Sequence, residues 1–421
     1  MDVRRVRAHP LSSPIDPPQK RRFHGGVRRL RKRDVVLVVV ETGDGSRGFA
    51  PAGASSSAMR EYFAGDSQAA FAEAIESVVA PVLEGRTFES VDAVHAAVDG
   101  TDLPERLRHE AASALDVAWY DLRGKRAGAP IYELLGERYG TEPTPTLPLY
   151  ASAGMYMEPE GYARQAAILE SLGFFGYKYR PGIDPAGDRR TVELLAETVD
   201  ELAIMLDAHT WWKLGDRSYE RELVADLVEH AGKHGAYWVE EPVKPDDYDG
   251  YAALAALGVP LAGGESEVSP EGLLALGGTG AVDFLQGDVR HHRGYTGCWR
   301  AVEFCADAGI AFVPHNFGTW LGLVANAHLA AAAPSASLLE YPVFEDDPAL
   351  AASRPGDDSG EDPGMYPFDL AFDILEADLA VVDGSFTVPD GPGLGVDVDE
   401  GVVERYPFVE GPWTEFDYDD G

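Results

Sequence analysis

Short apolar runs that each end in a polar residue recur through the second half of the chain. Seven such runs lie between residues 175 and 340, and their polar ends follow one another at intervals of 23 to 33 residues. One strand and one crossover helix together take roughly 30 residues. The residues at the run ends are Lys178, Asp207, Glu240, Glu265, Asp288, His315 and Glu340. A polar side chain at the carboxyl end of each successive strand is typical of a TIM-barrel active site.

The segments between these runs have the pattern of amphipathic helices. Helices are expected over residues 159–172, 190–199, 219–234 and 269–278. The last begins with Ser269 as its N-cap and Pro270 in its first turn. Residues 146–152 are predicted to be the first strand and residues 337–340 the eighth. The sequence therefore predicts an α/β barrel over residues 146–345.

Residues 1–145 have the pattern of a smaller α+β domain, in which strands precede helices. Two strands joined at Gly43–Gly45 are predicted within residues 34–51. Helix is predicted over residues 68–98, with a break at Pro81, and again from Pro104 to a C-cap at Gly124.

Residues 1–33 are locally basic, and within them LSSPIDPPQ (residues 11–19) and HGG (residues 24–26) are predicted to be loop. This segment is either a solvated edge or a mobile lid that carries cations over an anionic substrate. Residues 346–421 begin as an acidic, Gly/Pro-rich loop and continue as a short strand, a turn and a terminal helix. Because this tail is too short to fold alone, we expect it to return to the N-terminal domain.

The chain is strongly acidic, with 71 Asp and Glu against 35 Lys and Arg and a formal net charge of −36. The acids are spread along the chain, which favours adaptation to high salt over the alternative of an acidic interaction surface. Either interpretation argues against a nucleic-acid partner, which requires a basic face. The longest apolar run, residues 35–40, is too short to span a membrane. Cys298 and Cys305 are too far apart along a helix for a disulfide. We expect a cytoplasmic protein.

Three of the run ends are carboxylates on consecutive predicted strands: Asp207, Glu240 and Glu265. Clustered anions repel one another strongly unless a cation lies between them. A ligand set made of oxygen atoms without cysteine favours Mg²⁺ over Zn²⁺. The sequence therefore predicts a Mg²⁺ site, with the neighbouring acids Glu241 and Glu267 expected to point elsewhere.

The remaining run ends suggest substrate binding and proton transfer. Lys178 and Arg180 share one side of a strand and are expected to hold a substrate carboxylate. Asp288 and His315 lie on successive strand ends, where the carboxylate would orient the imidazole and make it a candidate general base.

Two further candidates have less certain roles. His209 follows Asp207 by two residues and either donates a proton to a leaving hydroxyl or binds substrate. Glu340 either hydrogen-bonds the substrate or is structural. His291 and His292, in the loop after Asp288, are expected at the surface.

Several segments together resemble the enolase superfamily, and within it the mandelate racemase subgroup. The resemblance is carried by RHEAASALDVAWYDLRGKRAGAPIYELLG, GYKYRPG, MLDAH, WVEEP, GGE, LQGDVRHHRGYTG, VPHNF and PGLGVDVDEGVVERY. It implies a modified TIM barrel, (β/α)7β, with an α+β capping domain built from residues 1–145 and the tail 346–421. It also implies Mg²⁺ bound by Asp207, Glu240 and Glu265, a small-molecule carboxylate substrate, abstraction of its α-proton, and a homo-oligomer.

One position departs from the family pattern and bears on the reaction. Where a Lys-x-Lys motif would place a second lysine as a base, this chain has Arg180, which stays protonated. A site with one base on one face favours elimination over racemisation. The resemblance therefore points to a hydro-lyase, an acid-sugar dehydratase that gives a 2-keto-3-deoxy acid. A racemase, epimerase or cycloisomerase is the alternative, and a non-catalytic binding protein is disfavoured by the full set of site residues. Arg21, Arg22 or Arg28 of the lid would contact sugar hydroxyls or a distal carboxylate.

Overall fold

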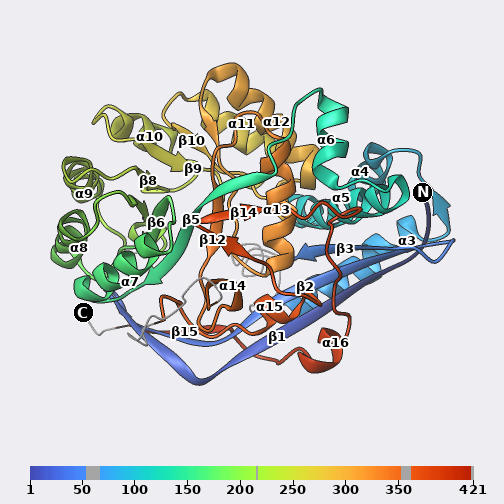
Figure 1. Cartoon of the computed structure of the whole chain (residues 1–421), viewed down its shortest axis with the longest axis horizontal. Coiled ribbons are helices and arrows are strands. Elements are labelled where there is room, and N and C mark those ends of the chain that lie inside the picture. Colours follow the sequence, from blue (N-terminus) through green and yellow to red (C-terminus); the bar gives the residue numbers. More distant parts are fainter. Residues whose placement is uncertain (54–66, 215–216, 352–361, 419–421) are drawn as a thin grey trace.

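The structure is a computed structural model that describes residues 1–53, 67–214, 217–351 and 362–418. Its centre is a barrel of eight parallel strands (Figure 1). These strands are β5 (Thr146–Met155), β6 (Gly176–Arg180), β7 (Ala203–Asp207), β8 (Trp238–Glu240), β9 (Leu261–Gly263), β10 (Phe284–Leu285), β11 (Ala311–Phe312) and β12 (Leu339–Pro342). Neighbours pair in parallel from β5 to β11, and β12 pairs with β5. A bridge between Phe312 and Ala336 joins the remaining gap.

Seven helices follow the first seven strands and surround the barrel. They are α7 (Pro159–Ser171), α8 (Pro185–Thr198), α9 (Arg221–Lys233), α10 (Tyr248–Ala255), α11 (Pro270–Gly278), α12 (Gly294–Ala308) and α13 (Trp320–Ala332). The predicted N-cap of α11 is present, because the Ser269 hydroxyl accepts a hydrogen bond from Gly272 N at 3.1 Å. The alternation of strands and helices confirms the predicted (β/α)7β barrel.

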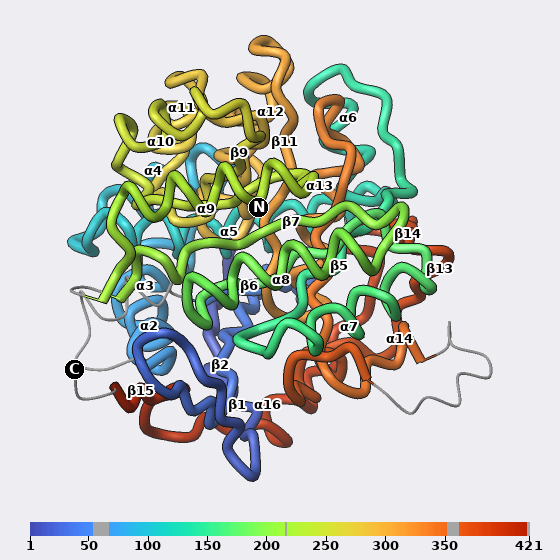
Figure 2. Tube along the Cα trace, turned by 90° about the vertical axis from the view of Figure 1, so that its left-hand side faces the viewer, coloured from blue at the N-terminus to red at the C-terminus, as the bar shows by residue number. Residues whose placement is uncertain are grey.

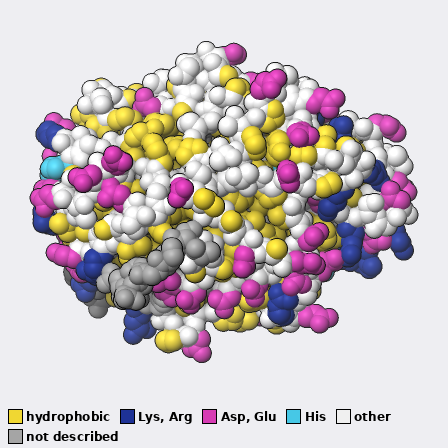
Figure 3. Space-filling model, in the orientation of Figure 1, with side chains coloured by type: hydrophobic (Ala, Val, Ile, Leu, Met, Phe, Trp, Pro, Cys, Tyr) yellow, Lys and Arg dark blue, Asp and Glu magenta, His cyan; other side chains and the backbone are white. Residues whose placement is uncertain are grey.

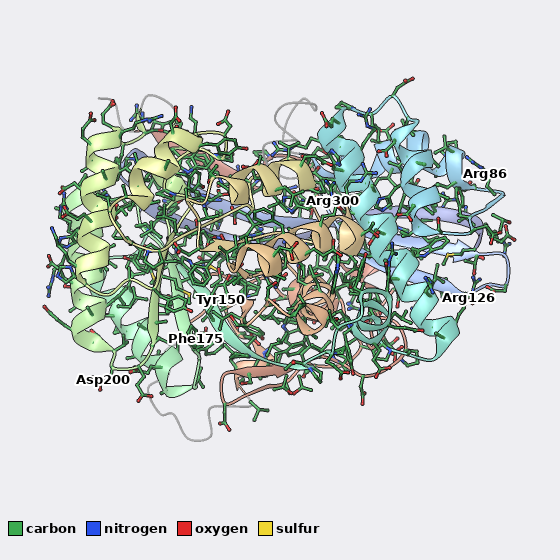
Figure 4. All side chains as sticks on the ribbon, turned by 90° about the horizontal axis from the view of Figure 1, so that it is seen from above. Arg86, Arg126, Tyr150, Phe175, Asp200 and Arg300 are labelled. Carbon is green, nitrogen blue, oxygen red and sulfur yellow. The ribbon has the colours of Figure 1, made fainter. Side chains whose placement is uncertain are left out.

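The interior of the barrel is filled by apolar side chains from its strands. Tyr150, Met205, Trp238, Ala262, Val313 and Leu338 form one buried cluster. Tyr150 and Trp238 meet edge to face, with ring centroids 5.2 Å apart. Figure 4 shows Tyr150 deep among the ribbons, whereas Arg86 and Arg126 lie at one end of the molecule. The centre is therefore a packed core, and polar chemistry is confined to the mouth above it.

The N-terminal residues form a long antiparallel hairpin, so the loop predicted for residues 11–19 is wrong, whereas the turn of the hairpin lies in the HGG segment, at residues 24–25. β1 (Asp2–Phe23) pairs with β2 (Gly26–Thr42) along most of its length. The prolines of β1 are tolerated because, among the described residues, the other side of β1 pairs with little more than the short β4 (Arg86–Thr87) and a bridge from Leu11 to Pro407. β3 (Arg47–Ala52) pairs with the other side of β2, as the predicted turn at residues 43–45 requires. Figure 1 shows the hairpin running beneath the barrel.

The helices of this region are α2 (Gln68–Ala74), a π-helical segment (Ile75–Val79), α3 (Ala80–Leu83), α4 (Val91–Asp99), α5 (Glu105–Ala127) and α6 (Ile131–Tyr139). The predicted break at Pro81 is wrong, because Pro81 lies in the first turn of α3, where its missing N–H is not needed. The predicted C-cap at Gly124 is also wrong. Gly128 ends α5 in the left-handed conformation, with φ of 69°. Gly124 instead packs against Gly393, where an added Cβ would lie 2.5 Å from the backbone.

The C-terminal tail pairs with both parts of the molecule. Its helices are α14 (Pro348–Ala351), α15 (Leu370–Asp373) and α16 (Val402–Arg405). The hairpin of β13 (Val381–Val382) and β14 (Ser385–Thr387) adds to β5 of the barrel. β15 (Thr414–Tyr418), which the sequence pattern did not predict, pairs with β2. The domain limits at residues 145 and 345 stay a prediction.

The surface is rich in acidic side chains. Figure 3 shows Asp and Glu spread over the visible face rather than gathered in one patch. No helix among the described residues is sufficiently long and apolar to cross a membrane. The adaptation to high salt stays a prediction.

Candidate active site at the barrel mouth

The predicted site residues all lie at or just beyond the carboxyl ends of barrel strands. Lys178 and Arg180 are in β6, Asp207 ends β7 and Glu240 ends β8. Asp207 and Glu240 stand opposite each other in the register of β7 and β8. Glu265, Asp288 and His315 follow β9, β10 and β11 by two or three residues, and Glu340 lies in β12. Because the carboxyl ends of parallel strands meet at one rim, these side chains share the barrel mouth.

The three carboxylates predicted to bind metal are each held by a basic side chain. Arg180 Nε donates to Asp207 Oδ2 at 2.9 Å, and Lys178 Nζ donates to Glu240 Oε1 at 2.7 Å. Glu265 Oε2 lies 2.9 Å from His315 Nε2. Burial, together with the negative charges of Asp207, Glu340 and Glu265, raises the pKa of Glu240 to about 8 despite the nearby Lys178. The mouth therefore holds more negative charge than its own cations neutralise.

This donor set fits a Mg²⁺ ion. Asp207 Oδ1 is buried beside His209 Nδ1, which lies 2.5 Å away. Asp207 and Glu240 are both buried, and clustered buried carboxylates are costly unless a cation lies among them. All three groups offer oxygen atoms, which Mg²⁺ prefers. Their oxygens do not all lie within 4.8 Å of one another, so a shared cation requires the side chains to draw together.

Lys178 is fully buried between two acids. Its Nζ lies 2.7 Å from Glu240 Oε1 and 2.8 Å from Glu340 Oε1, above the Tyr150 ring. Burial alone would lower the pKa of Lys178, but Glu240 and Glu340 outweigh it and raise the pKa well above its usual value. Lys178 is therefore a fixed positive charge rather than a base. Glu340 also accepts a hydrogen bond from Asn316 N at 2.9 Å.

Arg180 is a second fixed charge on the same strand. Its guanidinium lies 4.4 Å from the centre of the Phe317 ring as well as against Asp207. Although burial opposes it, Asp207 raises the pKa of Arg180 above its usual value. The side of the mouth at β6 thus offers two cations and no group that can accept a proton at usable pH.

Asp288 and His315 form the expected pair. His315 Nδ1 donates to Asp288 Oδ2 at 2.9 Å, which leaves Nε2 facing the carboxylate cluster. Glu265 and Asp288 outweigh the effect of burial and raise the pKa of His315 to about 10. Asp288 is further fixed by Arg290 Nε, at 3.1 Å from each carboxylate oxygen, and by Asn326 Nδ2 at 3.2 Å. Burial would raise the pKa of Asp288, but Arg290 and His315 hold it well below its usual value.

The other histidines near the mouth have different surroundings. His209 is half-buried, and its Nδ1 lies 2.5 Å from Asp207 Oδ1. The surface position expected for His292 is wrong, because its ring is buried and Nδ1 accepts a hydrogen bond from Asp288 N at 3.0 Å. Its Nε2 lies 3.0 Å from Glu267 O, so His292 ties the loop after β10 to the loop after β9. His291 is half-buried, 3.7 Å from Glu110.

Three residues that the sequence analysis did not single out contact the site. Gln286 Nε2 donates to Glu240 Oε2 at 2.8 Å, Asn316 N binds Glu340, and Arg290 fixes Asp288. Gln286 precedes Asp288 by two residues, and side chains two apart on a strand lie on the same face. This spacing is the signal in the sequence that could have identified Gln286.

The carboxylate of Glu241 accepts hydrogen bonds from Ser266 N and Oγ.

The tip of the β1–β2 hairpin reaches the barrel mouth. His24 N donates to Gly182 O at 2.9 Å, after β6, and the His24 ring lies 4.4 Å from that of Tyr219. Arg21 donates to Met365 O at 2.8 Å, and Arg22 is exposed. Arg28 is buried, with Nε donating to Thr414 Oγ1 at 3.0 Å and Nη1 lying 3.5 Å from Met155 Sδ at the mouth.

Arg28 and Arg33 both lie in β2 of the hairpin, and we call them the arginine pair. Trp413 lies between them, 4.7 Å from the Arg28 guanidinium and 4.9 Å from that of Arg33. Arg33 also faces Phe317, the ring that Arg180 contacts. Burial, with the repulsion of Arg180 and Arg33, lowers the pKa of Arg28. Within the described part of the chain, neither arginine of the pair forms an ion pair with a carboxylate.

Comparison with known proteins assigns the chain and its fold to one family. A domain model described as enolase C-terminal domain-like matches residues 161–402. A model of the N-terminal domain of mandelate racemase / muconate lactonizing enzymes matches residues 14–136. The first model alone covers more than half of the chain.

Individual relatives share the whole length or most of it. D-galactarolactone cycloisomerase from Agrobacterium fabrum is 26% identical over 96% of this chain and 99% of its own. Arabinonate dehydratase from Saccharolobus solfataricus is 28% identical over 70% of this chain and 71% of its own. A solved structure of an enolase superfamily member from Polaromonas sp. JS666 has a TM-score of 0.79 and 26% identity, covering 98% of this chain and 99% of its own. The chain therefore belongs to the enolase superfamily, in its mandelate racemase and muconate lactonizing enzyme family.

Proposed function

We propose that this protein is a Mg²⁺-dependent acid-sugar dehydratase, a carbon–oxygen lyase that removes water from a polyhydroxy carboxylate. The observation that carries the proposal is the asymmetry of the mouth. Lys178 and Arg180 are both held as cations on the side of β6, whereas the titratable nitrogen of His315, paired with Asp288, lies on the other side. Glu265 is the main cause of the raised pKa of His315, so Mg²⁺ bound to Glu265 would lower that pKa and leave Nε2 able to accept a proton. A single base suits elimination, whereas racemisation needs an acid/base group on each face of the substrate.

The proton that leaves first is the one α to the substrate carboxylate. His315 Nε2 takes this proton, and the C–H electron pair forms an enediolate. Lys178 and Arg180, which lie beside the carboxylates of the mouth, would stabilise that negative charge. The β C–O bond then breaks, and the hydroxyl leaves with a proton from His315 or His209. The enol product tautomerises to a 2-keto-3-deoxy acid, with the net loss of one water.

Asp207, Glu240 and Glu265 are the residues that would hold Mg²⁺. When bound, this ion supplies Lewis-acid stabilisation of the charge that develops on the substrate carboxylate. A racemase from Streptomyces coelicolor with the same fold, at a TM-score of 0.74 and 22% identity, was solved with bound magnesium. The burial of Asp207 and Glu240 and the raised pKa of Glu240 support a cation in this chain as well.

The arginine pair of the hairpin supports an oxygen-rich, anionic substrate. A buried guanidinium without a carboxylate partner is unusual, and it is most so in a chain with 71 acids. Arg28 and Arg33 therefore supply positive charge beside the mouth that is not paired with a carboxylate of the described residues. In our proposal they bind the sugar hydroxyls or a second carboxylate, at the end of the substrate away from the α-carbon.

A cycloisomerase or racemase of the same family is the second candidate. It is favoured by the full-length similarity to D-galactarolactone cycloisomerase, whereas the similarity to arabinonate dehydratase covers 70% of this chain. Both reactions begin with α-proton abstraction, so the two candidates differ only in the fate of the enediolate.

A panel of aldonic acids, aldaric acids and aldarolactones separates these candidates. We expect wild-type protein with Mg²⁺ in high salt to form a 2-keto acid from at least one aldonic or aldaric acid. His315→Asn should abolish that product, while Lys233→Met, on the outer helix α9, should keep it. Conversion of a lactone without loss of water, and no 2-keto product from any acid, would identify a cycloisomerase and contradict the dehydratase.

A further inference from the structure

Two histidines and one glutamate meet on the outer face of the barrel, away from the mouth. Glu193 lies in α8, whereas His230 lies in the last turn of α9 and His234 follows it as the C-cap residue. Helices α8 and α9 run side by side (Figure 2). One potential ligand atom from each of the three side chains lies within 4.8 Å of the others, and no other group of this kind occurs among the described residues.

The local geometry prepares both imidazoles to bind a metal. His230 and His234 are four residues apart, so their rings project from the same face of the helix end, with centroids 4.4 Å apart. His234 Nδ1 lies 2.9 Å from His230 O, to which its N–H donates, so Nε2 keeps its lone pair. A histidine ligand fixed in this way by a backbone carbonyl is the usual arrangement around protein-bound metals.

His230 and Glu193 complete the set. His230 Nε2 lies 3.2 Å from Glu193 Oε1, yet this nitrogen is buried and has no hydrogen bond of good geometry. The other oxygen of Glu193 is 3.5 Å from Arg190 Nη1, so that ion pair leaves Oε1 directed at the histidines. All three side chains are half-buried, which leaves a fourth coordination position open to solvent.

We propose that Glu193, His230 and His234 bind a divalent transition-metal ion of the Zn²⁺ type that links α8 to α9. Two imidazole nitrogens and one carboxylate suit Zn²⁺, whereas Mg²⁺ prefers oxygen ligands alone. The site lies at the C-terminal end of α9, which is the end opposite the barrel mouth. Residues on that side of a TIM barrel contribute to stability rather than to catalysis. The metal therefore stabilises the helix pair behind β6 and β7 without taking part in the reaction.

Zinc titration in saturating Mg²⁺ tests the proposal. We expect isothermal titration calorimetry of the full-length protein to show saturable binding of Zn²⁺, and the melting temperature to rise with Zn²⁺. A double variant, His230→Gln with His234→Gln, should weaken this binding at least 100-fold and remove the rise. Glu193→Gln should weaken Zn²⁺ binding about tenfold. The control His9→Gln replaces a half-buried histidine of β1 outside the site and should leave Zn²⁺ binding unchanged.

Cobalt provides a readout that does not depend on stability. Co²⁺ bound by two imidazoles and a carboxylate gives visible absorption bands, which we expect in wild type and not in the double variant. If the double variant is poorly folded, Glu193→Gln alone still decides the question through its weaker Co²⁺ titration. The proposal is overturned if wild type shows no saturable Zn²⁺ binding, or if binding persists unchanged in the double variant, which would assign the zinc to the carboxylates of the mouth.

Discussion

At the scale of single residues, Lys178 determines much of the charge balance of the mouth. One ammonium group lies within 2.8 Å of both Glu240 and Glu340, and all three side chains are buried. Removing one member of a buried ion pair leaves the partner charge uncompensated in a medium of low polarity. A substitution of Lys178 is therefore expected to change both the stability of the fold and the chemistry proposed for the site.

We expect Lys178→Met to lower the free energy of unfolding by about 3–5 kcal/mol, which urea denaturation in the presence of EDTA would measure. The control is Lys213→Met, which removes an ion pair with Glu265 at 3.8 Å from a side chain that is one-third exposed. That change should cost less than about 1 kcal/mol. A Lys178→Met protein as stable as wild type would show that the two glutamates do not depend on this lysine.

Single positions differ in how far sequence can predict them. The strand-end residues can be predicted from the sequence because each ends an apolar run at a regular interval. Their partners were not, since the contact of Lys178 with Glu340 joins residues far apart in the chain. His292 was placed wrongly because it follows a strand end, where loops are usually exposed, and only the neighbouring loop buries it.

At the scale of elements, the β1–β2 hairpin connects the two parts of the molecule. The prolines of β1 hide a strand, and β2 pairs at its start with β15, from the other end of the chain. No local pattern specifies such a partner. The contact between α5 and the tail is similar, because Gly124 and Gly393 approach closely although more than half of the chain separates them.

A pair of helical glycines tests this contact. Gly124→Ala places a Cβ 2.5 Å from the Gly393 backbone, so we expect a loss of about 1–3 kcal/mol in the free energy of unfolding. Gly278→Ala, at the end of α11, meets no atom within 4 Å and should be neutral or slightly stabilising. Equal stability of the two variants in thermal and urea unfolding would contradict the close packing of α5 on the tail.

At the scale of the whole molecule, two buried histidines make stability depend on pH. Burial lowers the pKa of both His292 and His328 to about 4 from 6.5. They are neutral in the folded protein at pH 5 but protonated in the unfolded chain, so unfolding takes up protons. The corresponding stability is complete above pH 6.5 and is lost as the pH falls towards 4.

The contribution of one histidine is measurable by substitution. His328 Nε2 donates to Leu394 O at 3.0 Å and Nδ1 accepts from Tyr132 N, contacts that glutamine can partly replace. Between pH 6.5 and 4.5, we expect the free energy of unfolding of His328→Gln to fall less steeply than that of wild type, by up to about 1.4 kcal/mol per pH unit. Parallel pH profiles of the two proteins would contradict the neutral, buried state of His328.

The net charge of −36 leads to a prediction about salt. The screening length falls from about 10 Å at 0.1 M to about 3 Å at 1 M salt, which weakens repulsion between surface carboxylates. We expect the melting temperature to rise steadily when KCl is raised from 0.1 to 2 M. A melting temperature that is flat or falls over this range would favour the alternative, in which the acids form an interaction surface.

The most direct test of the central claim, a mouth with a single base, is the fate of the α-proton in deuterated water. With a substrate that wild type dehydrates, NMR should show that His315→Asn neither forms the 2-keto acid nor exchanges the α-proton, although it binds substrate with Mg²⁺. Exchange of the α-proton that continues in His315→Asn would show a second base on the side of β6 and contradict the proposed mechanism.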